Sequence, residues 1–305
     1  MRHGLENLTV IITGASGGIG EALANTFGEA GCRLALFSRS RHASLAEYVA
    51  SHPWRDRAMS LSVDIRDNAA VERALLDVRE SFGRADVCIV NAGIWPTESL
   101  ALHEQPVRRI REVVETNLLG AAFTARAFLE SLAVTGPRAD DRGASLCFVG
   151  STAGRFGEAG HSEYAMSKAA LLGLVRSLKN EIVALDRYGR VNMVEPGWTA
   201  TPMAAQALAD HEALRSAIST MPLQQIARAQ DIANAVAFLS SPALARHVSG
   251  EVLTVAGGME GRRQWRDAEI DVAAVIDRLQ PDDHHCSPAQ EGADPADDPA
   301  STPPR

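Results

Sequence analysis

The sequence predicts an α/β protein built on a parallel sheet with helices on both faces. Three observations lead to this expectation. Short runs rich in β-branched residues alternate with longer amphipathic segments, which is the pattern of βαβ units. Several of these runs are apolar at nearly every position, as expected for strands that are covered on both faces. A glycine-rich run directly follows the first of them.

Taken in order, the apolar runs and amphipathic segments define the elements of one domain. Strands are expected at residues 9–13, 33–37, 58–63, 87–90, 145–149, 190–194 and 251–255. Helices are expected between them, near residues 19–30, 43–51, 68–82, 107–131, 163–185 and 228–240. No repeat or linker interrupts residues 5–258, and a single α/β domain of this length is common. We therefore expect one domain over residues 1–260.

Beyond this domain the composition changes twice. Residues 261–280 are expected to form an amphipathic extension, with a helix at 267–279 that Pro281 ends. Its apolar stripe consists of Ala268, Val272, Val275, Ile276 and Leu279. Residues 281–305 hold six acidic residues, one basic residue and six prolines, and no large aliphatic side chain. Such a segment buries too little surface to offset its ordering entropy, so we expect a disordered acidic tail.

Charge and hydropathy exclude several classes of protein. The net charge is −8, of which residues 281–305 contribute −5, so a nucleic-acid binder acting through a basic surface is not expected. We find no apolar run of the roughly 18 residues that a membrane span needs, and expect no membrane segment. The first residues lead directly into a strand, which leaves no room for a signal peptide. These features predict a cytoplasmic protein.

The four cysteines do not form the pattern of a disulfide framework. Cys32, Cys88 and Cys147 lie at or inside apolar strand-like runs, which predicts buried thiols in a reducing compartment. Cys286 lies in the predicted tail, and a metal site there would need pre-organised ligands that such a segment does not provide. No metal site is expected.

The glycine-rich run has the composition of a phosphate-binding loop. It reads Thr-Gly-Ala-Ser-Gly-Gly-Ile-Gly over residues 13–20 and joins the first strand to a helix. Gly14, Gly18 and Gly20 allow a tight turn and close approach of a pyrophosphate, and the N-terminus of the helix offers free N–H groups to an anion. This context favours dinucleotide binding over a structural glycine turn.

The end of the second strand indicates which dinucleotide is bound. An acidic residue at this point accepts hydrogen bonds from a free ribose 2′-hydroxyl, whereas a cation accommodates a 2′-phosphate. Here the strand ends in Phe37-Ser38-Arg39-Ser40-Arg41, without a carboxylate. Arginine forms charge-assisted and often bidentate bonds with a phosphate. The sequence therefore favours NADP(H) over NAD(H).

A serine, a tyrosine and a lysine complete the set of residues with catalytic potential. Tyr164 and Lys168 are four residues apart and share one face of a predicted helix. A nearby cation stabilises a phenolate, so we expect Lys168 to lower the pKa of Tyr164 toward neutral pH. Ser151 follows the fifth strand, at the edge of a parallel sheet where ligands bind.

With these motifs in this order, the sequence resembles the short-chain dehydrogenase/reductase family over about residues 8–259. The shared elements are Thr13–Gly20, Val63-Asp64, Asn91-Ala92-Gly93, Asn117, Ser151, Tyr164-x-x-x-Lys168, Pro196-Gly197, Ser249-Gly250 and Gly257-Gly258. The resemblance implies a Rossmann-type, doubly wound sheet of seven parallel strands in the order 3-2-1-4-5-6-7. It also implies hydride transfer between a nicotinamide cofactor and a ketone or secondary alcohol.

The resemblance also implies a role for each motif. Tyr164 would be the general acid/base, Ser151 would hold the substrate oxygen, and Lys168 would bind the nicotinamide ribose. Asn117 would anchor a water that passes protons from Lys168 to solvent. The implied cofactor-binding residues are Gly14, Ser16, Gly18, Ile19, Gly20, Ser38, Arg39, Asp64, Ile65, Asn91, Ala92, Gly93, Tyr164, Lys168, Pro196, Gly197, Thr199 and Thr201. Among them, Asp64 would meet the adenine, Asn91 the adenosine ribose and Thr199 the carboxamide.

Two positions depart from the family pattern. Gly17 stands where members that prefer NADP often have a basic residue, so the cofactor preference depends on Ser38 and Arg39. Ala256 stands where an aspartate commonly precedes the terminal glycine pair. Neither change involves the proton-transfer residues.

The substrate is a small carbonyl compound or alcohol whose identity the residues leave open. Trp95, Phe156 and Trp198 are candidate apolar walls, and Arg155, Glu158 and His161 are candidate polar contacts. Residues 203–221 are expected to form a flap over them. This mixture suits a cyclic or secondary-metabolite ketone as well as a 3-oxoacyl thioester.

Two alternatives that involve no net redox reaction remain, a non-catalytic nucleotide-binding regulator and an epimerase or dehydratase. The resemblance also implies a homodimer or homotetramer, in which the helices near 107–131 and 163–185 pair across a two-fold axis. Their apolar positions are Ala121, Ala122, Phe123, Ala125, Phe128, Ala169, Leu172, Leu174, Val175 and Leu178.

Overall fold

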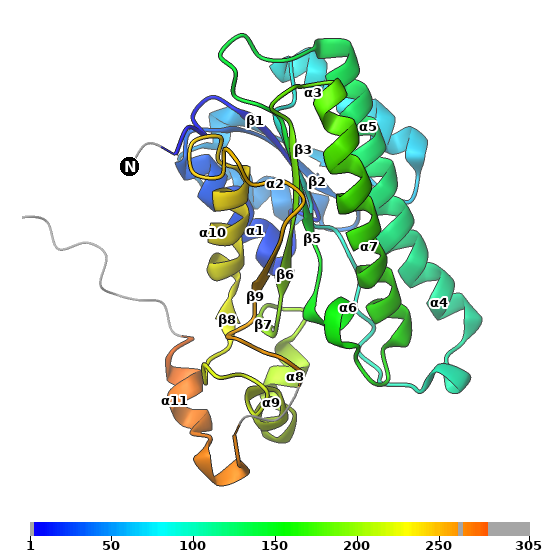
Figure 1. Cartoon of the computed structure of the whole chain (residues 1–305), viewed down its shortest axis with the longest axis vertical. Coiled ribbons are helices and arrows are strands. Elements are labelled where there is room, and N and C mark those ends of the chain that lie inside the picture. Colours follow the sequence, from blue (N-terminus) through cyan, green and yellow to red (C-terminus); the bar gives the residue numbers. More distant parts are fainter. Residues whose placement is uncertain (1–2, 262–264, 280–305) are drawn as a thin grey trace, which may run out of the picture.

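The computed structural model of the chain describes residues 3–261 and 265–279. Seven parallel strands form one sheet in the order β3-β2-β1-β4-β5-β6-β9 (Figure 1). These strands are β1 (Thr9–Thr13), β2 (Arg33–Ser38), β3 (Ala58–Ser62), β4 (Val87–Val90), β5 (Ser145–Val149), β6 (Arg190–Pro196) and β9 (Val252–Val255). The predicted fold class and strand order are therefore confirmed.

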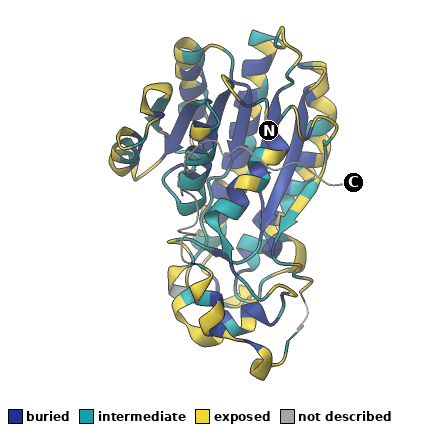
Figure 2. Cartoon of the chain, turned by 90° about the vertical axis from the view of Figure 1, so that its left-hand side faces the viewer, coloured by how far each residue is buried: buried dark blue, intermediate teal, exposed yellow. Residues whose placement is uncertain are grey.

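Helices cover both faces of the sheet (Figure 1). One face carries α1 (Gly18–Glu29), α2 (His42–Ala50) and α10 (Ala229–Ser240). The other face carries α3 (Asn68–Phe82), α5 (Gly120–Thr135) and α7 (Ser162–Glu181), with α4 (Val107–Val114) against α7. Strands β1, β4, β5 and β6 are buried at every position, because both of their faces are covered (Figure 2).

Short elements gather at the carboxyl ends of the strands (Figure 1). They are α6 (Thr152–Phe156), the strands β7 (Thr199–Ala200) and β8 (Ala227–Arg228), α8 (Ala205–Ala209), α9 (His211–Ile218) and α11 (Val272–Asp277). β7 and β8 pair as a separate two-stranded sheet. Of these short elements, α11 was predicted as part of the helix at 267–279, and α8 and α9 lie within the predicted flap. The remaining three are too short to show a periodic pattern of their own.

The helix predicted near residues 107–131 is a composite. A π-helical turn at Glu115–Leu119 separates α4 from α5, so the helical stretch runs over Val107–Thr135. By length and composition alone this stretch could cross a membrane, contrary to our reading of the sequence. However, it packs on the sheet and buries Phe128 and Leu132 in the core, and core helices of folded domains often have such compositions.

Part of the proposed dimer surface is not available for self-association. Ala121, Ala125, Phe128 and Val175 are fully buried in the protein's own core. They pack between the sheet and the helices that cover it. These apolar positions therefore serve the protein's own core and not an interface between subunits. Ala122, Phe123, Leu172, Leu174 and Leu178 are half-buried, and Ala169 is exposed.

The predicted extension differs from a single helix over 267–279. Asp267–Glu269 forms a turn of 3₁₀-helix, and α11 begins only at Val272, because the Asp271 carboxylate caps it by accepting a hydrogen bond from the Ala274 N–H. The extended backbone at Ile270 places that side chain in the core beside Val272 and Val275. The predicted tail at 281–305, with Cys286, lies outside the described residues. Cys32, Cys88 and Cys147 are free and buried, as predicted.

Candidate active site

A cleft of about 1130 Å³ follows the carboxyl ends of the parallel strands. Its walls come from the loops after β1, β2, β3, β4, β5 and β6 and from one side of α9. All the predicted catalytic and cofactor-binding residues line it except Asn117, which is buried. The topology brings these residues together because parallel strands all end at the same edge of the sheet.

The glycine-rich loop is shaped for close approach of a ligand. Gly14 has φ +67°, and a Cβ there would lie 2.8 Å from the Cα of Ala92. A Cβ on Gly18 would lie 2.9 Å from the Cδ of Pro202. Gly17 precedes α1 without a side-chain cap, so the N-terminus of this 12-residue helix faces the cleft through backbone alone. Backbone N–H groups and the positive end of a helix fit the pyrophosphate of a dinucleotide.

The end of β2 offers a hydroxyl and a cation to the same cleft. Ser38 is buried, and its Oγ lies 2.7 Å from the Oγ of Ser16 in the glycine-rich loop. Arg39 is exposed, and it takes part in none of the ion pairs found within the described part of the chain. No carboxylate of that part therefore forms a salt bridge with Arg39.

Two predicted adenosine contacts are already engaged within the protein. Arg66 forms a bidentate ion pair with Asp64, with an Nη2–Oδ2 distance of 2.6 Å, and this hydrogen bonding lowers the pKa of Asp64. The side-chain amide of Asn91 donates to the carbonyl oxygens of Thr13 and Gly14, at 3.0 and 3.3 Å. Asn91 thus ties β4 to the glycine-rich loop, a structural role that the sequence did not reveal.

Ser151 and Tyr164 both line the cleft, within hydrogen-bonding reach of each other. Ser151 caps α6, where its Oγ accepts a hydrogen bond of 3.2 Å from the Ala153 N–H. Burial raises the pKa of Tyr164 to about 12; hydrogen bonding with Ser151 lowers it, and the charge of Glu158 raises it further. The phenol therefore holds its proton at neutral pH, which is the state that a proton donor needs.

Lys168 is buried beside Tyr164. Its Nζ donates a hydrogen bond of 2.9 Å to the Val149 carbonyl oxygen and lies 5.9 Å from the centre of the Tyr164 ring. Burial lowers the pKa of Lys168 to about 8. The expected lowering of the Tyr164 pKa by Lys168 is not found. The ammonium group faces the ring and the Val149 carbonyl, and burial of the phenol has the larger effect.

Asn117 belongs to the π-helical turn between α4 and α5. Its Oδ1 accepts from the Ile94 N–H at 2.8 Å, and its Nδ2 donates to the Ile94 carbonyl oxygen and to Ser167 Oγ. A Cβ on Gly93 would lie 3.2 Å from Asn117 Oδ1 and 3.3 Å from Lys168 Nζ, so these two groups meet beside Gly93. π-Helical turns are frequent at functional sites. Hydropathy patterns could not reveal this one.

Some of the predicted substrate contacts are in place and others are not. Trp95, Trp198 and Glu158 line the cleft. Arg155 instead donates to Thr254 Oγ1, and Phe156 lies against Gly261, so both are outside the cleft wall. The flap predicted over residues 203–221 contributes Met203, Ala213, Ser216, Ala217 and Thr220 to the cleft, whereas Thr116 in the π-helical turn was not predicted. No hydropathy pattern indicates Thr116, because the π-helical turn that carries it does not show in the sequence.

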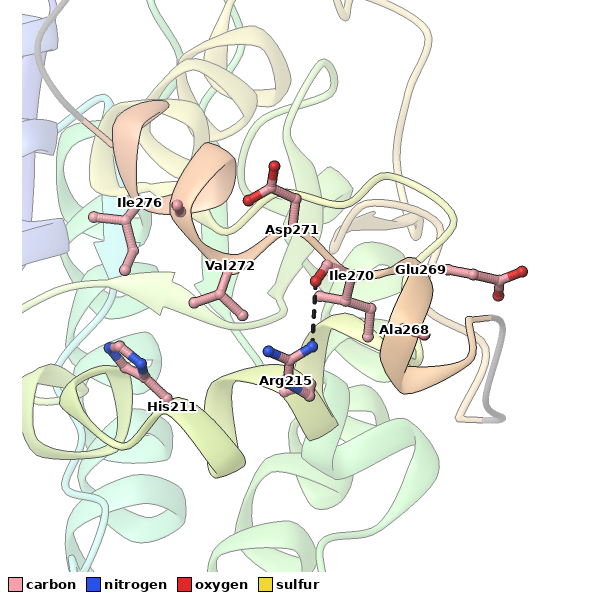
Figure 3. Close-up of a pocket in the computed structure, with 9 residues that line it drawn as sticks. His211, Arg215, Ala268, Glu269, Ile270, Asp271, Val272 and Ile276 are labelled. Atoms are coloured by element: carbon pink, nitrogen blue, oxygen red, sulfur yellow. Dashed lines mark hydrogen bonds between the residues drawn. The ribbon is translucent and has the colours of Figure 1, made fainter.

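The C-terminal extension packs on the outer side of α9 (Figure 3). Ile270, Val272 and Val275 share a buried apolar cluster with Leu214, Ala217, Ile218, Met221 and Ile226. Arg215 donates hydrogen bonds to the carbonyl oxygens of Asp267 and Ile270 at 2.6 and 3.2 Å. A shallow pocket of about 550 Å³ opens between the two segments. α9 is thus held between the extension and the cleft.

The sheet and cleft together define a dinucleotide-binding α/β protein of the Rossmann type. The family described as Enoyl-(Acyl carrier protein) reductase matches residues 14–260. The chain is 32% identical to the 3-oxoacyl-[acyl-carrier-protein] reductase FabG of Escherichia coli (strain K12), over 83% of this chain and 98% of that protein. It is 34% identical to the L-rhamnose 1-dehydrogenase (NAD(P)(+)) of Azotobacter vinelandii, over 82% and 96%.

Among solved structures, a short-chain dehydrogenase/reductase (glucose/ribitol dehydrogenase) from Brucella melitensis superimposes with a TM-score of 0.76 and 28% identity, over 85% of this chain and 99% of that chain. The chain therefore belongs to the short-chain dehydrogenase/reductase family. It is an oxidoreductase that acts on a carbonyl group or the corresponding alcohol with a nicotinamide cofactor. The two non-redox alternatives receive no support from these relatives.

Proposed function

We propose that this oxidoreductase reduces a ketone with NADPH and that Tyr164 is its general acid. The observation that carries the proposal is that the glycine-rich loop, Ser38-Arg39 and the group of Ser151, Tyr164 and Lys168 all border one cleft. A dinucleotide extended along this cleft spans from Arg39 to Tyr164. When bound, the nicotinamide supplies the hydride.

The protein's own residues supply the proton and the positioning. Ser151 holds the substrate carbonyl oxygen by donating its hydroxyl proton in a hydrogen bond. Tyr164 transfers its phenolic proton to that oxygen as the hydride reaches the carbon, so the product is a neutral alcohol. Lys168, anchored on the Val149 carbonyl oxygen, binds the ribose hydroxyls of the nicotinamide. Asn117 anchors the water through which Tyr164 regains a proton by way of Lys168.

The preference for NADPH is supported by the end of β2. Ser38 and Arg39 border the cleft there, and no carboxylate occupies residues 37–41, where a free 2′-hydroxyl would need an acceptor. Arg39 is exposed and suits a bidentate contact with a phosphate. We assign the adenine contact to Asp64 on the side that Arg66 leaves open, and the carboxamide contact to the backbone at Thr199.

For the substrate, a 3-oxoacyl thioester is one candidate, because a 3-oxoacyl-[acyl-carrier-protein] reductase is among the similar proteins. A cyclic or hydroxylated ketone is the other, and the polar side chain of Glu158 in the cleft supports it.

We further propose that the enzyme is cytoplasmic and forms at least a dimer. The π-helical turn between α4 and α5 packs against α7, and large apolar side chains remain exposed on these segments. Leu119 is 42% exposed and Met166 52% exposed. A self-complementary patch of this kind suits closure by a two-fold axis.

The test is reduction of a panel of ketones by the purified protein with NADPH or NADH, followed by the absorbance of the reduced nicotinamide. We expect turnover of at least one ketone, faster with NADPH. Tyr164→Phe is the matched control: it should bind NADPH as the wild type does and lose about 10²–10⁴-fold in kcat. Undiminished turnover in a folded Tyr164→Phe variant would show that another group donates the proton.

A further inference from the structure

The carboxylate of Glu158 stands in the cleft wall where a carbonyl substrate has to bind. It lines the same cleft as Trp95, Ser151 and Tyr164, and its side chain is 31% exposed. It is also close enough to Tyr164 for its negative charge to raise the pKa of the phenol. None of the roles assigned above to the proton-transfer residues requires an acid at this position.

The loop that carries Glu158 is held firmly in place. Gly157 and Gly160 have φ +78° and +82°, which gives the loop between α6 and α7 its two sharp turns. The Gly160 carbonyl oxygen accepts a hydrogen bond of 3.0 Å from the Leu100 N–H, and the Glu158 carbonyl oxygen accepts one of 3.1 Å from the His161 N–H. The carboxylate therefore projects from a pre-organised backbone.

The neighbours of Glu158 satisfy only part of its hydrogen-bonding capacity. A hydrogen bond from Trp95 reaches the carboxylate, which has about four acceptor sites. His161, which is 5% exposed and stacks on Trp95, lies 3.9 Å from it through Nδ1. That distance is too long for a hydrogen bond, and Nδ1 has no other partner in the described residues.

No basic side chain of the described residues compensates the charge within ion-pair distance other than His161. The nearby Arg155 is directed to Thr254 and Glu195, at 3.2 and 3.8 Å. His161 Nε2 is 2.9 Å from the Pro96 carbonyl oxygen, which can only accept, so this nitrogen carries a proton. Burial raises the pKa of Glu158, which reflects the cost of holding its charge in this wall.

We propose that Glu158 is a specificity-determining residue that accepts a hydrogen bond from a hydroxyl group of the substrate, and that the natural substrate is a hydroxylated carbonyl compound. This inference rests on the proposed ketone reduction. An acyl chain of a thioester placed against Glu158 would leave acceptor sites without water or partner, whereas a hydroxyl group provides the donor they lack. Sites built to bind a hydroxyl group discriminate strongly against analogues that lack it.

The experiment compares cyclohexanone with 2-, 3- and 4-hydroxycyclohexanone, which are isomers of one another, as substrates at saturating NADPH. The three isomers place the hydroxyl at different distances from the carbonyl. The wild type should reduce at least one isomer with a kcat/KM about 10- to 100-fold above that of cyclohexanone. Glu158→Leu should abolish this ratio, and Glu158→Gln, which keeps one carbonyl acceptor, should retain part of it.

Glu98→Gln is the matched control, because Glu98 is an exposed acid on the neighbouring loop and does not line the cleft. It should keep the wild-type ratio. NADPH binding, measured by the fluorescence of the bound nucleotide, should be the same in all variants. This second readout shows that the Glu158 variants are folded.

Two failures are distinguishable. If cyclohexanone and the three hydroxylated isomers are all inert with NADPH, the proposed ketone reduction fails for this class of compound. If cyclohexanone is reduced but no hydroxylated isomer is preferred, or if Glu158→Leu keeps the preference, the assignment of Glu158 is overturned. A higher kcat/KM for the N-acetylcysteamine thioester of acetoacetate than for every hydroxylated ketone would overturn it as well.

Discussion

Replacing Lys168 with methionine should make the protein more stable and much less active. The ammonium group is buried, with 6% of the residue exposed, and burial lowers its pKa from 10.5 to about 8. At 1.36 kcal/mol per pKa unit, the charged group costs the folded state about 3 kcal/mol. Losing the hydrogen bond to the Val149 carbonyl oxygen offsets about 1–2 kcal/mol of this gain, although water in the cleft can replace the donor. We expect a net gain of about 1–2 kcal/mol.

The stability gain of Lys168→Met should decrease as the pH rises. Below about pH 8, Lys168 is charged in both the folded and unfolded states, so the full penalty is present. Between about pH 8 and 10.4 the unfolded state binds a proton that the folded state does not, and wild-type stability rises with pH. The advantage of Lys168→Met should therefore be constant below about pH 8 and vanish above about pH 10.

The measurement is urea unfolding of the cofactor-free protein at several pH values, with Lys179→Met as the control. Lys179 lies on the same helix but reaches Asn180 at its surface, so its replacement should change stability little at any pH. NADPH affinity should fall in Lys168→Met and not in Lys179→Met. A Lys168→Met protein that is less stable than the wild type at pH 7, or whose gain persists unchanged above pH 10, would refute the reasoning.

Three further predictions concern the cofactor, the extension and the assembly. Arg39→Ala should raise the KM for NADPH about 10-fold or more while leaving that for NADH nearly unchanged, and Ser38→Asp should shift the preference toward NADH; steady-state kinetics with both nucleotides decides this. Val275→Asp places a charge in the cluster behind α9 and should raise the KM for ketone and lower the thermal midpoint, whereas truncation before Pro281 should change neither. Light scattering should show at least a dimer for the wild type and a monomer for Leu119→Arg, and a monomeric wild type contradicts the proposed interface.

Sequence patterns predicted the main elements of the fold because the strands form short apolar runs and the main helices are long enough to show a period. The seven strands were placed within a few residues of their observed bounds, and the order of β1 to β6 and β9 agrees with the resemblance. The pattern over 107–131 was continuous, however, and gave no sign of the π-helical turn at Glu115–Leu119. Within that turn, Asn117 contacts Ile94 and Ser167, which are distant in sequence.

In the candidate site, too, the sequence predicted some features and missed those that depend on tertiary contacts. Ser151, Tyr164 and Lys168 were predicted as catalytic candidates because their residue types and spacing indicate one kind of chemistry, and they border one cleft. The direction in which the pKa of Tyr164 shifts was not predicted correctly, because burial in the folded protein raises this pKa to about 12. Spacing could not separate Arg155, which points to Thr254, from Glu158, which lines the cleft. Arg155 lies in the last turn of α6 and Glu158 lies beyond it, and the backbone turn at Gly157, with φ +78°, separates them.

The sequence by itself determined the fold class and pointed to the glycine-rich loop and to Ser151, Tyr164 and Lys168, because apolar runs, glycine spacing and residue type are local properties of the chain. Only the tertiary structure decided that the extension braces α9, that Asn91 and Asp64 are engaged within the protein, and that Glu158 faces the cleft with acceptor sites to spare. These features arise from contacts between segments far apart in the chain. Desolvation and hydrogen-bond partners depend on the packed neighbours of a residue, and no local pattern encodes them.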